Sequence, residues 1–244
     1  MMKLIDKTYG LENTRLALRA CKEAHLKHKM IVVLAQSGNG KTEAVKHYLK
    51  SSAQVYYVEL KSSYTTKQVL GKLWSEIGGV EYDHKDSIIS LSKKIAEKLN
   101  EMPGNKLIII DEGGKFKREK VERFHEIYNL IEDCCGILIC APYYFEEKVK
   151  GWIDKRYLGV EEFSTRIYYW QELFDPTSAE IRYIFEDQGF VKIPEGLALL
   201  EDLVKAKKSE LSWRGIFFEI EQMVDAVNAK TTITGQNKRT FELT

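Results

Sequence analysis

Five short apolar runs, separated by segments with helical periodicity, restrict most strongly how this chain can fold. The runs are rich in β-branched or aromatic residues and have the length of buried strands. They are Ile31–Leu34, Val55–Leu60, Leu107–Ile110, Gly136–Cys140 and Arg166–Trp170. The helical patterns between them are Lys41–Leu49, Lys67–Ile77, Asp86–Leu99, Lys120–Ile131 and Glu146–Lys150. Strands that alternate with helices are joined by crossovers, so the sequence predicts an α/β fold with a five-stranded, mostly parallel sheet.

The strand signals stop after Trp170, and only helical patterns follow. These patterns are Pro176–Gln188, Pro194–Lys207 and Ser212–Ala229. The last residues are polar and lack periodicity, which is typical of a flexible terminus. We therefore expect an α/β core over residues 1–175, a small helical lid over residues 176–230 and a flexible tail over residues 231–244.

Composition limits the classes of protein that the chain can belong to. The hydrophobic fraction of 44% and the charged fraction of 30% are those of a folded soluble protein. The net charge of +1 neither favours nor excludes a nucleic-acid partner. The four cysteines lack zinc-ligand spacing, which predicts free thiols in a reducing compartment. With no secretory signal and no apolar run that can span a membrane, we expect a cytoplasmic protein without a membrane partner.

A glycine-rich loop follows the first apolar run. Residues 35–42 read Ala-Gln-Ser-Gly-Asn-Gly-Lys-Thr, the end of which matches a Walker A loop, with alanine replacing the usual first glycine. In such loops backbone amides surround phosphate oxygens, and the following helix adds its positive end. Lys41 should contact the β- and γ-phosphates of ATP, and Thr42 should bind Mg²⁺. A surface turn that merely contains Gly-Lys-Thr is the alternative, and it leaves the flanking strand and helix unexplained. The residues expected to contact the nucleotide are Ser37, Gly38, Asn39, Gly40, Lys41, Thr42 and Glu43.

Two carboxylates follow the third apolar run. Asp111 and Glu112 come directly after Leu107–Ile110, at the edge where open α/β sheets bind their ligands. Asp111 is expected to hold Mg²⁺, as the Walker B carboxylate does. Glu112 is then placed to deprotonate the attacking water as the general base. The alternative is a solvated acidic turn. In that case the chain would bind ATP but would lack this route to hydrolysis.

The order of these motifs resembles the AAA+ ATPases, and within them the transposition ATPases typified by the B protein of phage Mu. Residues 136–142 resemble the fourth strand of that family, although Cys140 and Ala141 stand where a polar sensor residue is usual. This departure bears on the rate of hydrolysis and not on binding. The resemblance implies a P-loop ATPase core that carries a helical lid.

Two further segments carry the resemblance. Residues 163–167 resemble the segment that carries an arginine finger, which implies that Arg166 completes the ATP site of a neighbouring subunit. Arg156 is the alternative finger, and an ordinary surface arginine is the alternative for both. Residues 212–215 resemble the second sensor motif, which implies that Arg214 contacts the bound phosphates.

Two loops carry the cations of a possible DNA surface. The first follows the second apolar run and the second follows the two carboxylates, so both should lie at one edge of the sheet. Contacts of lysine and arginine with phosphates bind DNA without reading its sequence. Solvated loops in a lysine-rich protein are the alternative. The candidate DNA contacts are Lys61, Lys67, Lys115, Lys117 and Arg118.

The resemblance implies an ATP-dependent regulator of DNA transposition. Such a protein would assemble as a homo-oligomer, a ring or a filament, on double-stranded DNA, deliver that DNA to a transposase, and disassemble on hydrolysis. A helicase loader of the replication type shares the same core and is one alternative. A nucleotide-controlled protein switch that does not bind DNA is the other.

Overall fold

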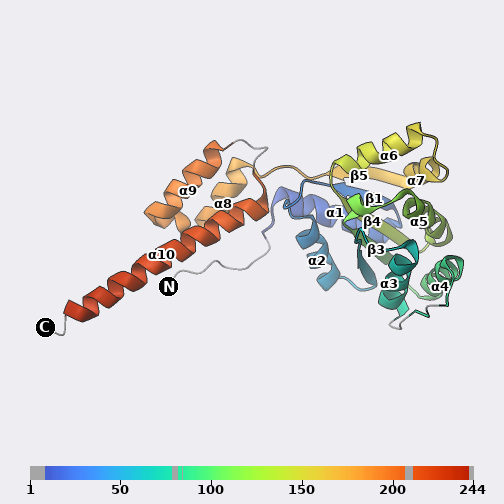
Figure 1. Ribbon diagram of the computed structural model, residues 1–244, viewed down its shortest axis with the longest axis horizontal. Coiled ribbons are helices and arrows are strands. Elements are labelled where there is room, and N and C mark those ends of the chain that lie inside the picture. The colour runs from blue at the N-terminus through green and yellow to red at the C-terminus, as the bar shows by residue number, and fades with distance from the viewer. Residues whose placement is uncertain (1–8, 79–81, 84, 207–210, 242–244) are drawn as a thin grey trace. The chain divides into compact units, whose positions relative to one another are not determined.

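The computed structural model describes residues 9–78, 82–83, 85–206 and 211–241, and no side chains beyond residue 230 (Figure 1). The chain divides into two compact units, which we call the core unit and the helical unit. The core unit consists of Glu12–Gln36 and Lys41–Leu173. The helical unit contains, among the described residues, residues 9–11, Ser37–Gly40 and the chain from Phe174 onward.

The core unit is built on a five-stranded sheet in which every neighbouring pair is parallel. The strand order is β2-β3-β4-β1-β5. All residues of β1, β3 and β4 are buried, because helices cover both faces of the sheet. The α/β fold and the parallel sheet predicted from the sequence are confirmed. The strands are β1 Met30–Leu34, β2 Val55–Glu59, β3 Lys106–Asp111, β4 Cys135–Ala141 and β5 Ile167–Glu172.

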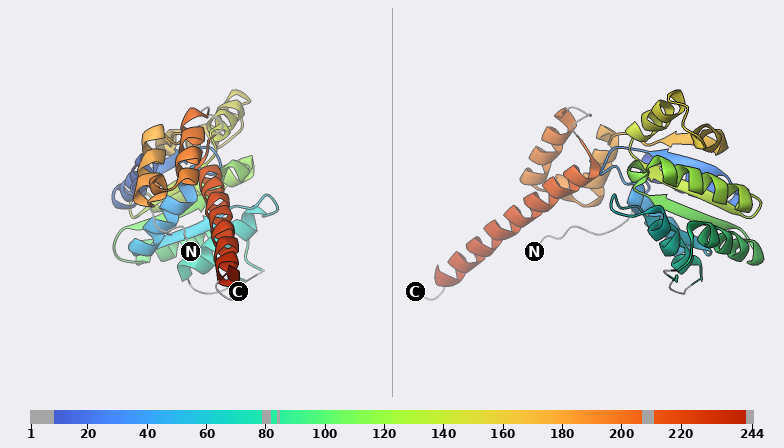
Figure 2. Two further views of the ribbon diagram at one scale, coloured as in Figure 1. Left: turned by 90° about the vertical axis from the view of Figure 1, so that its left-hand side faces the viewer. Right: turned by 45° about the vertical axis from the view of Figure 1, so that its right-hand side comes forward.

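Two layers of helices enclose this sheet (Figure 2). On one face, α1 (Glu12–Lys27) and α2 (Lys41–Ser51) pack on alternate strand residues such as Ile31 and Val33. On the other face, five helices pack on the intervening strand residues. These helices are α3 Thr66–Gly78, α4 Ile88–Glu101, α5 Arg118–Ile131, α6 Tyr144–Asp154 and α7 Val160–Arg166, and the short 3-10 helix η1 (Gly113–Lys115) lies between β3 and α5.

Two helices of the core unit were not predicted. The buried face of α1 is made mostly of small residues, including Ala17 and Ala20, so its periodicity is weak. Helix α7 has 7 residues, which is too short for a periodic pattern. Because α7 ends at Arg166, the fifth strand begins at Ile167, one residue later than predicted.

The helical C-terminal region predicted from the sequence is present. It contains α8 (Ser178–Asp187), η2 (Phe190–Lys192), α9 (Pro194–Lys205) and α10 (Trp213–Phe241) around one apolar core. Helix α8 begins later than the predicted Pro176, because Thr177 and Glu180 form a capping box that fixes the first turn. The predicted end of the second helix, at Lys207, lies outside the described residues.

The last helix differs from the sequence prediction. The helical pattern ended at Ala229, but the backbone of α10 continues to Phe241. No proline interrupts residues 230–241, so nothing in the sequence removes a hydrogen-bond donor there. Within the described parts of the chain, no helix combines the length and apolar character needed to cross a lipid bilayer.

Candidate functional site

A hydroxyl and a carboxylate meet at the carboxyl edge of the sheet. Thr42 lies in the first turn of α2, directly after the glycine-rich loop, and Asp111 is the last residue of β3. The Thr42 Oγ1 hydroxyl donates to Asp111 Oδ2 at 2.8 Å. Because β1 and β3 are parallel, their carboxyl ends share this edge, where such sheets bind ligands. The two residues predicted to bind Mg²⁺ therefore lie together.

Asp111 is buried and accepts two further hydrogen bonds. Its side chain is 3% exposed, and Oδ2 also accepts from the Tyr57 hydroxyl at 2.9 Å. The backbone N–H of Glu112 donates to Oδ1 at 2.7 Å. Burial, and then the carboxylate of Asp111, raise the pKa of Tyr57, so its hydroxyl stays protonated and donates. These donors hold the carboxylate in one orientation.

Tyr57 is not among the site residues predicted from the sequence. The sequence does indicate its position, because side chains alternate between the two faces of a strand, and Tyr57 therefore lies on the same face of β2 as Glu59. Glu59 is the register partner of Asp111. A polar side chain two residues before the end of the neighbouring strand was thus a candidate contact of the Walker B carboxylate.

Lys41 lies at the first position of α2, next to the backbone of the loop. Its Nζ donates to the carbonyl oxygens of Ala35, at 2.6 Å, and Gln36, at 2.9 Å. Gly40 has φ +85°, a conformation that favours glycine, and no atom lies near the position of an added Cβ. A phosphate group can therefore approach this backbone closely, so the loop fits the nucleotide predicted for it. Glu43 lies exposed in the first turn of α2.

Glu112 differs from Asp111 in both backbone and exposure. It has φ 59° in the left-handed region and precedes η1. Its side chain is half exposed, and Oε2 forms an ion pair with Lys115 Nζ at 3.2 Å. An exposed pair of this kind contributes little stability, so the carboxylate remains available to a proton from water.

The position of the usual polar sensor is apolar. Cys140 is fully buried in β4, and burial, followed by the charge of Asp111, raises the pKa of its thiol well above the ordinary value. Ala141 ends the strand, and its carbonyl accepts from the backbone N–H of Ala35 at 3.1 Å. Neither side chain is a strong hydrogen-bond donor.

The middle of the glycine-rich loop belongs to the helical unit. The Arg214 backbone N–H donates to the Gly38 carbonyl at 3.2 Å, and Arg214 Nη1 donates to Ser37 Oγ at 3.4 Å. Gly38 has φ +88°, and an added Cβ would lie 3.0 Å from both Arg214 Cβ and Ser212 Oγ. A side chain at this position would therefore disturb the backbone and the contact with Arg214.

Asn39 forms a further contact that the sequence did not predict. It is 0% exposed, and its Nδ2 donates to Asp175 Oδ1 at 3.0 Å and to the Phe174 carbonyl at 3.4 Å. Phe174 and Asp175 are the first residues of the chain that leads into α8. Two successive residues of the loop, Gly38 and Asn39, thus hydrogen-bond with the helical unit to which they belong.

The two candidate arginine fingers lie apart from Thr42 and Asp111. Arg166 directly precedes β5 and therefore lies at the amino edge of the sheet, opposite the carboxyl edge. Its Nη1 forms an ion pair with Glu132 Oε2 at 3.1 Å. Arg156 is exposed in the turn after α6, with φ 54°.

The candidate DNA contacts lie on two loops at the carboxyl edge. The loop with Lys61 follows β2, and the loop with Lys115, Lys117 and Arg118 follows the neighbouring β3. Lys61 Nζ lies 5.7 Å from the centre of the Tyr64 ring. Lys67 begins the neighbouring helix α3, within its first turn.

No group of three histidine, cysteine, aspartate or glutamate side chains that could hold a metal ion exists among the described residues. The pair of Thr42 and Asp111 offers two oxygen ligands, and Mg²⁺ commonly completes its shell with phosphate oxygens and water. The donor set thus fits a Mg²⁺ ion that arrives with a nucleotide.

Comparisons with known proteins agree with this geometry. A family model described as "AAA domain" matches residues 25–149. The structure of the Aeropyrum pernix Orc1 protein in complex with DNA is similar, with a TM-score of 0.57, 16% identity, and coverage of 76% of this chain and 50% of that chain. The structure of the Aeropyrum pernix Orc2 protein, in ADPNP-ADP complexes, is also similar. It has a TM-score of 0.55 and 16% identity, with coverage of 78% of this chain and 54% of that chain.

A Walker-type ATPase of Pyrococcus abyssi has a TM-score of 0.53 and 12% identity, with coverage of 100% of this chain and 79% of that chain. At such identities the similarity concerns the fold. The chain spans about half the length of the two Aeropyrum structures. No curated protein matches the chain significantly.

Proposed function

This chain belongs to the AAA domain family, and on that premise we propose that it binds and hydrolyses ATP with Mg²⁺ to control its assembly on DNA. One observation carries the proposal, namely the 2.8 Å contact between Thr42 Oγ1 and Asp111 Oδ2. A hydroxyl at the start of the P-loop helix and a carboxylate at the end of a central strand are the pair that holds Mg²⁺ in P-loop ATPases. A Mg²⁺ ion held by this pair would supply positive charge to the phosphates of the nucleotide.

The residues around this pair have separate roles in the proposal. Lys41 exchanges the carbonyl oxygens of Ala35 and Gln36 for phosphate oxygens, which accept stronger, charge-assisted hydrogen bonds. Glu112 accepts the proton of the attacking water as the general base. Its ion pair with Lys115 is exposed, so this pair opens at little cost.

A second subunit completes the site in this proposal. Arg166 lies at the edge of the sheet opposite Thr42 and Asp111, so it cannot serve the site of its own chain without a large rearrangement. It is therefore proposed to act on the site of a neighbouring copy in a ring or a filament. Arg156 is the alternative, and it forms no ion pair among the described residues.

The contacts of Arg214 provide a route from the nucleotide to the helical unit. Arg214 binds Gly38 through its backbone and Ser37 through its side chain. Phosphate binding by the loop amides would reorient both partners. We therefore propose that Arg214 transmits the nucleotide state to α10.

DNA is the proposed macromolecular partner, through the loops with Lys61 and Lys67 and with Lys115, Lys117 and Arg118. The replication-type ATPase is favoured over the transposition regulator, because the fold is similar to that of an Orc1 protein in complex with DNA. The transposition proposal, with a transposase as its partner, rests only on the resemblance of residues 136–142, 163–167 and 212–215. The protein switch without DNA stays as the alternative of another class.

The first test measures ATP hydrolysis with and without double-stranded DNA. We expect hydrolysis that DNA stimulates and that Lys41→Ala abolishes. Turnover that ignores both double-stranded and single-stranded DNA would contradict the DNA part of the proposal and favour the protein switch. An unchanged rate in Lys41→Ala would contradict the ATP site itself.

The second test separates DNA binding from ATP binding. We expect charge reversal of Lys61 and Lys67 to weaken DNA binding while ATP binding stays unchanged. The double variant Lys22→Glu with Lys93→Glu, in exposed positions of α1 and α4, is the control that changes the net charge by the same amount. Equal weakening by the control would show that overall charge, and not these loops, determines the affinity.

A further inference from the structure

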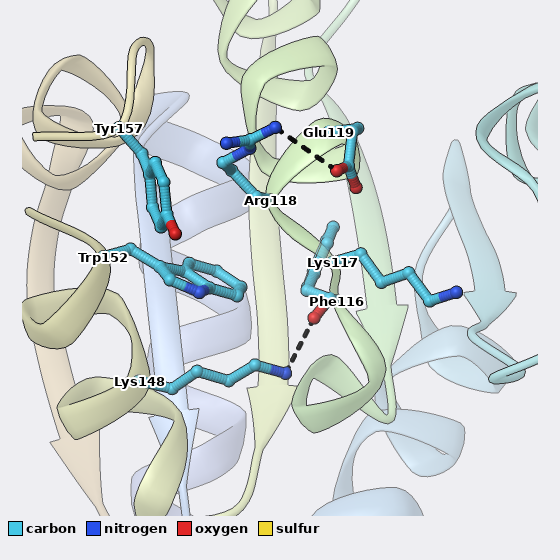
Figure 3. A pocket seen from close by; sticks show the side chains of 7 residues that line it. All are labelled: Phe116, Lys117, Arg118, Glu119, Lys148, Trp152 and Tyr157. Carbon is cyan, nitrogen blue, oxygen red and sulfur yellow. Dashed lines mark hydrogen bonds and ion pairs between the residues drawn. The ribbon is translucent and has the colours of Figure 1, made fainter. Parts of the chain in front are cut away.

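A pocket of about 320 Å³ lies between the start of α5 and helix α6 (Figure 3). None of the residues of the proposed ATP site lines it. Its volume is at the lower end of the range of sites for small molecules, roughly 300–1,000 Å³. The lining residues are Phe116, Lys117, Arg118, Glu119, Lys148, Trp152 and Tyr157.

Aromatic rings form one side of this pocket. Figure 3 shows Trp152 and Tyr157 on one side and Phe116 and Lys117 on the other. The guanidinium of Arg118 lies over the Tyr157 ring, 4.6 Å from its centre. A cation at this distance from a ring is held by the ring quadrupole. Arg118 thus presents a planar, charged surface stacked on an aromatic one.

Lys148 is fixed at another side of the pocket. Its Nζ donates to the carbonyl oxygens of Gly114, at 2.9 Å, and Phe116, at 2.8 Å. The same ammonium lies 5.1 Å from the centre of the Trp152 ring. Because an ammonium has three N–H donors, these two hydrogen bonds leave one donor for another acceptor. Lys148 is therefore held in place with one donor left for a ligand.

Positive charge exceeds negative charge around the pocket. Three cations and one carboxylate line it, and the carboxylate, Glu119, lies 3.6 Å from Arg118 in an exposed pair. Beside them, Lys120 is 2% exposed, and among the described residues its ammonium has no hydrogen-bond partner. Burial, and then the nearby charge of Lys117, lower the pKa of Lys120, and Lys148 adds to this effect. An anion bound here would reduce this repulsion.

We propose that this pocket binds one nucleoside phosphate unit, with its phosphate near Arg118 and Lys148 and its base against the aromatic side. A simple anion would pair with the cations but would not contact the aromatic rings. An apolar ligand would contact the rings but would leave the cations without a negative charge. Aromatic stacking combined with cations is how proteins bind bases of any sequence. This nucleoside phosphate is either part of a nucleic-acid strand or a free nucleotide. If it is part of a strand, the inference rests on the proposed function.

The experiment uses the full chain with Lys41→Ala, which removes nucleotide binding at the P-loop. Arg118→Gln and Tyr157→Leu alter the pocket, whereas Arg123→Gln on α5 and Tyr168→Leu on β5 are matched controls outside it. The probes are a fluorescein-labelled oligothymidylate of about 15 nucleotides, followed by anisotropy, and AMP, followed by calorimetry. We expect both pocket variants to weaken the binding of at least one probe about fivefold to tenfold, and the controls to leave it unchanged.

The two probes distinguish the sources of the ligand. Weaker oligonucleotide binding in both pocket variants identifies a strand, and weaker AMP binding alone identifies a free nucleotide. Unchanged binding of both probes overturns the proposal, even where the protein binds duplex DNA through its other loops. If the unaltered protein binds no DNA at all, the DNA part of the proposed function fails, and the AMP arm still decides the pocket.

A cross-linking measurement does not depend on the folding of the variants. An oligonucleotide with 5-iodouracil is irradiated on the protein, and the attached peptides are identified by mass spectrometry. Attachment to Trp152 or Tyr157 supports the strand. Attachment only to peptides that contain none of the lining residues contradicts it.

Discussion

The core unit carries two groups of charged side chains, one around the P-loop and one around the pocket of α5 and α6. In the first group, the charged side chains have hydrogen-bond partners within the site. Around the P-loop, Asp111 accepts hydrogen bonds from Thr42, Tyr57 and the backbone of Glu112. Lys41 donates to two carbonyl oxygens of its own loop. Each buried charge here has partners that already point at it.

The second group, around the pocket of α5 and α6, is not balanced. Among the residues that line the pocket, Glu119 is the one carboxylate opposite Lys117, Arg118 and Lys148. Within the described parts of the chain, the buried ammonium of Lys120 has no hydrogen-bond partner. A buried charge without partners lowers the stability of the folded chain. Such a residue is found where its charge contributes to the binding of a ligand or of another part of an assembly.

The difference separates two ways of binding phosphate. The first group holds its own charges in place, so it can position a metal ion and a water molecule for chemistry. The second group has a surplus of positive charge, so the ligand itself supplies the missing charge. Substitutions in the first group should therefore change chemistry, and those in the second should change affinity and stability.

The largest expected effect is on hydrolysis, in Glu112→Gln. The amide cannot accept the proton of water, so we expect the rate to fall about 10²–10⁴-fold while ATP binding is unchanged. Phosphate release and the binding of a fluorescent ATP analogue measure the two quantities. Glu101→Gln, on the exposed end of α4, is the control and should leave both unchanged. A normal rate in Glu112→Gln would assign the base to another residue.

The next effect is on stability, in Lys148→Met. The substitution leaves the carbonyl oxygens of Gly114 and Phe116 without their donor, so we expect the free energy of unfolding to fall by about 2 kcal/mol. Urea denaturation followed by circular dichroism measures it. Lys150→Met on the same helix removes an exposed ion pair with Glu146 and should cost less than about 0.5 kcal/mol. Equal losses would mean that Lys148 does not stabilise the loop.

Tyr57→Phe tests the balance of the first group. It removes one hydrogen bond to a charged, buried carboxylate, so we expect a loss of about 1.5 kcal/mol in the free energy of unfolding. Tyr56→Phe is the matched control on the same strand, because within the described parts of the chain its hydroxyl has only a weak hydrogen bond, to Met102 Sδ at 3.8 Å. If the two variants lose the same stability, the hydroxyl of Tyr57 has no special part in holding Asp111.

The strands could be predicted because their signal is local. Every residue of β3 and β4 is buried, so the apolar runs are visible without knowledge of their neighbours. Helix α1 was missed because alanines such as Ala20 and Ala24 carry most of its buried face, and small residues give a weak pattern.

The site could be predicted only in part, for the same reason. Thr42 and Asp111 lie in motifs with fixed spacing, and the parallel sheet alone brings their two strand ends to one edge. Tyr57 and Asn39 depend on contacts between segments far apart in the sequence, which no motif encodes. The pocket combines the start of α5 with α6 and the turn after it, so its charge surplus exists only in the folded chain.

The smallest expected effect, in Lys120→Met, has the opposite sign from the others. Methionine has a similar length and no charge, so replacing a buried cation without a partner should raise the free energy of unfolding by about 1 kcal/mol. The folded-state pKa of Lys120 is lowered, so its cost is fully present below that lowered pKa, where the lysine is charged in both the folded and the unfolded chain. The cost shrinks as pH rises through the lowered pKa toward the ordinary lysine value of about 10.4. The gain from methionine should therefore shrink over the same range.

Urea denaturation at pH 7 and at about pH 10 measures this gain, with Lys93→Met on α4 as the exposed control that should change little. If Lys120→Met destabilises the chain at neutral pH, Lys120 has a stabilising partner, and the charge surplus is smaller than the structure indicates. If Lys120→Met stabilises the chain and also weakens the binding of a nucleoside phosphate, then Lys120 lowers the stability of the chain but contributes to ligand binding.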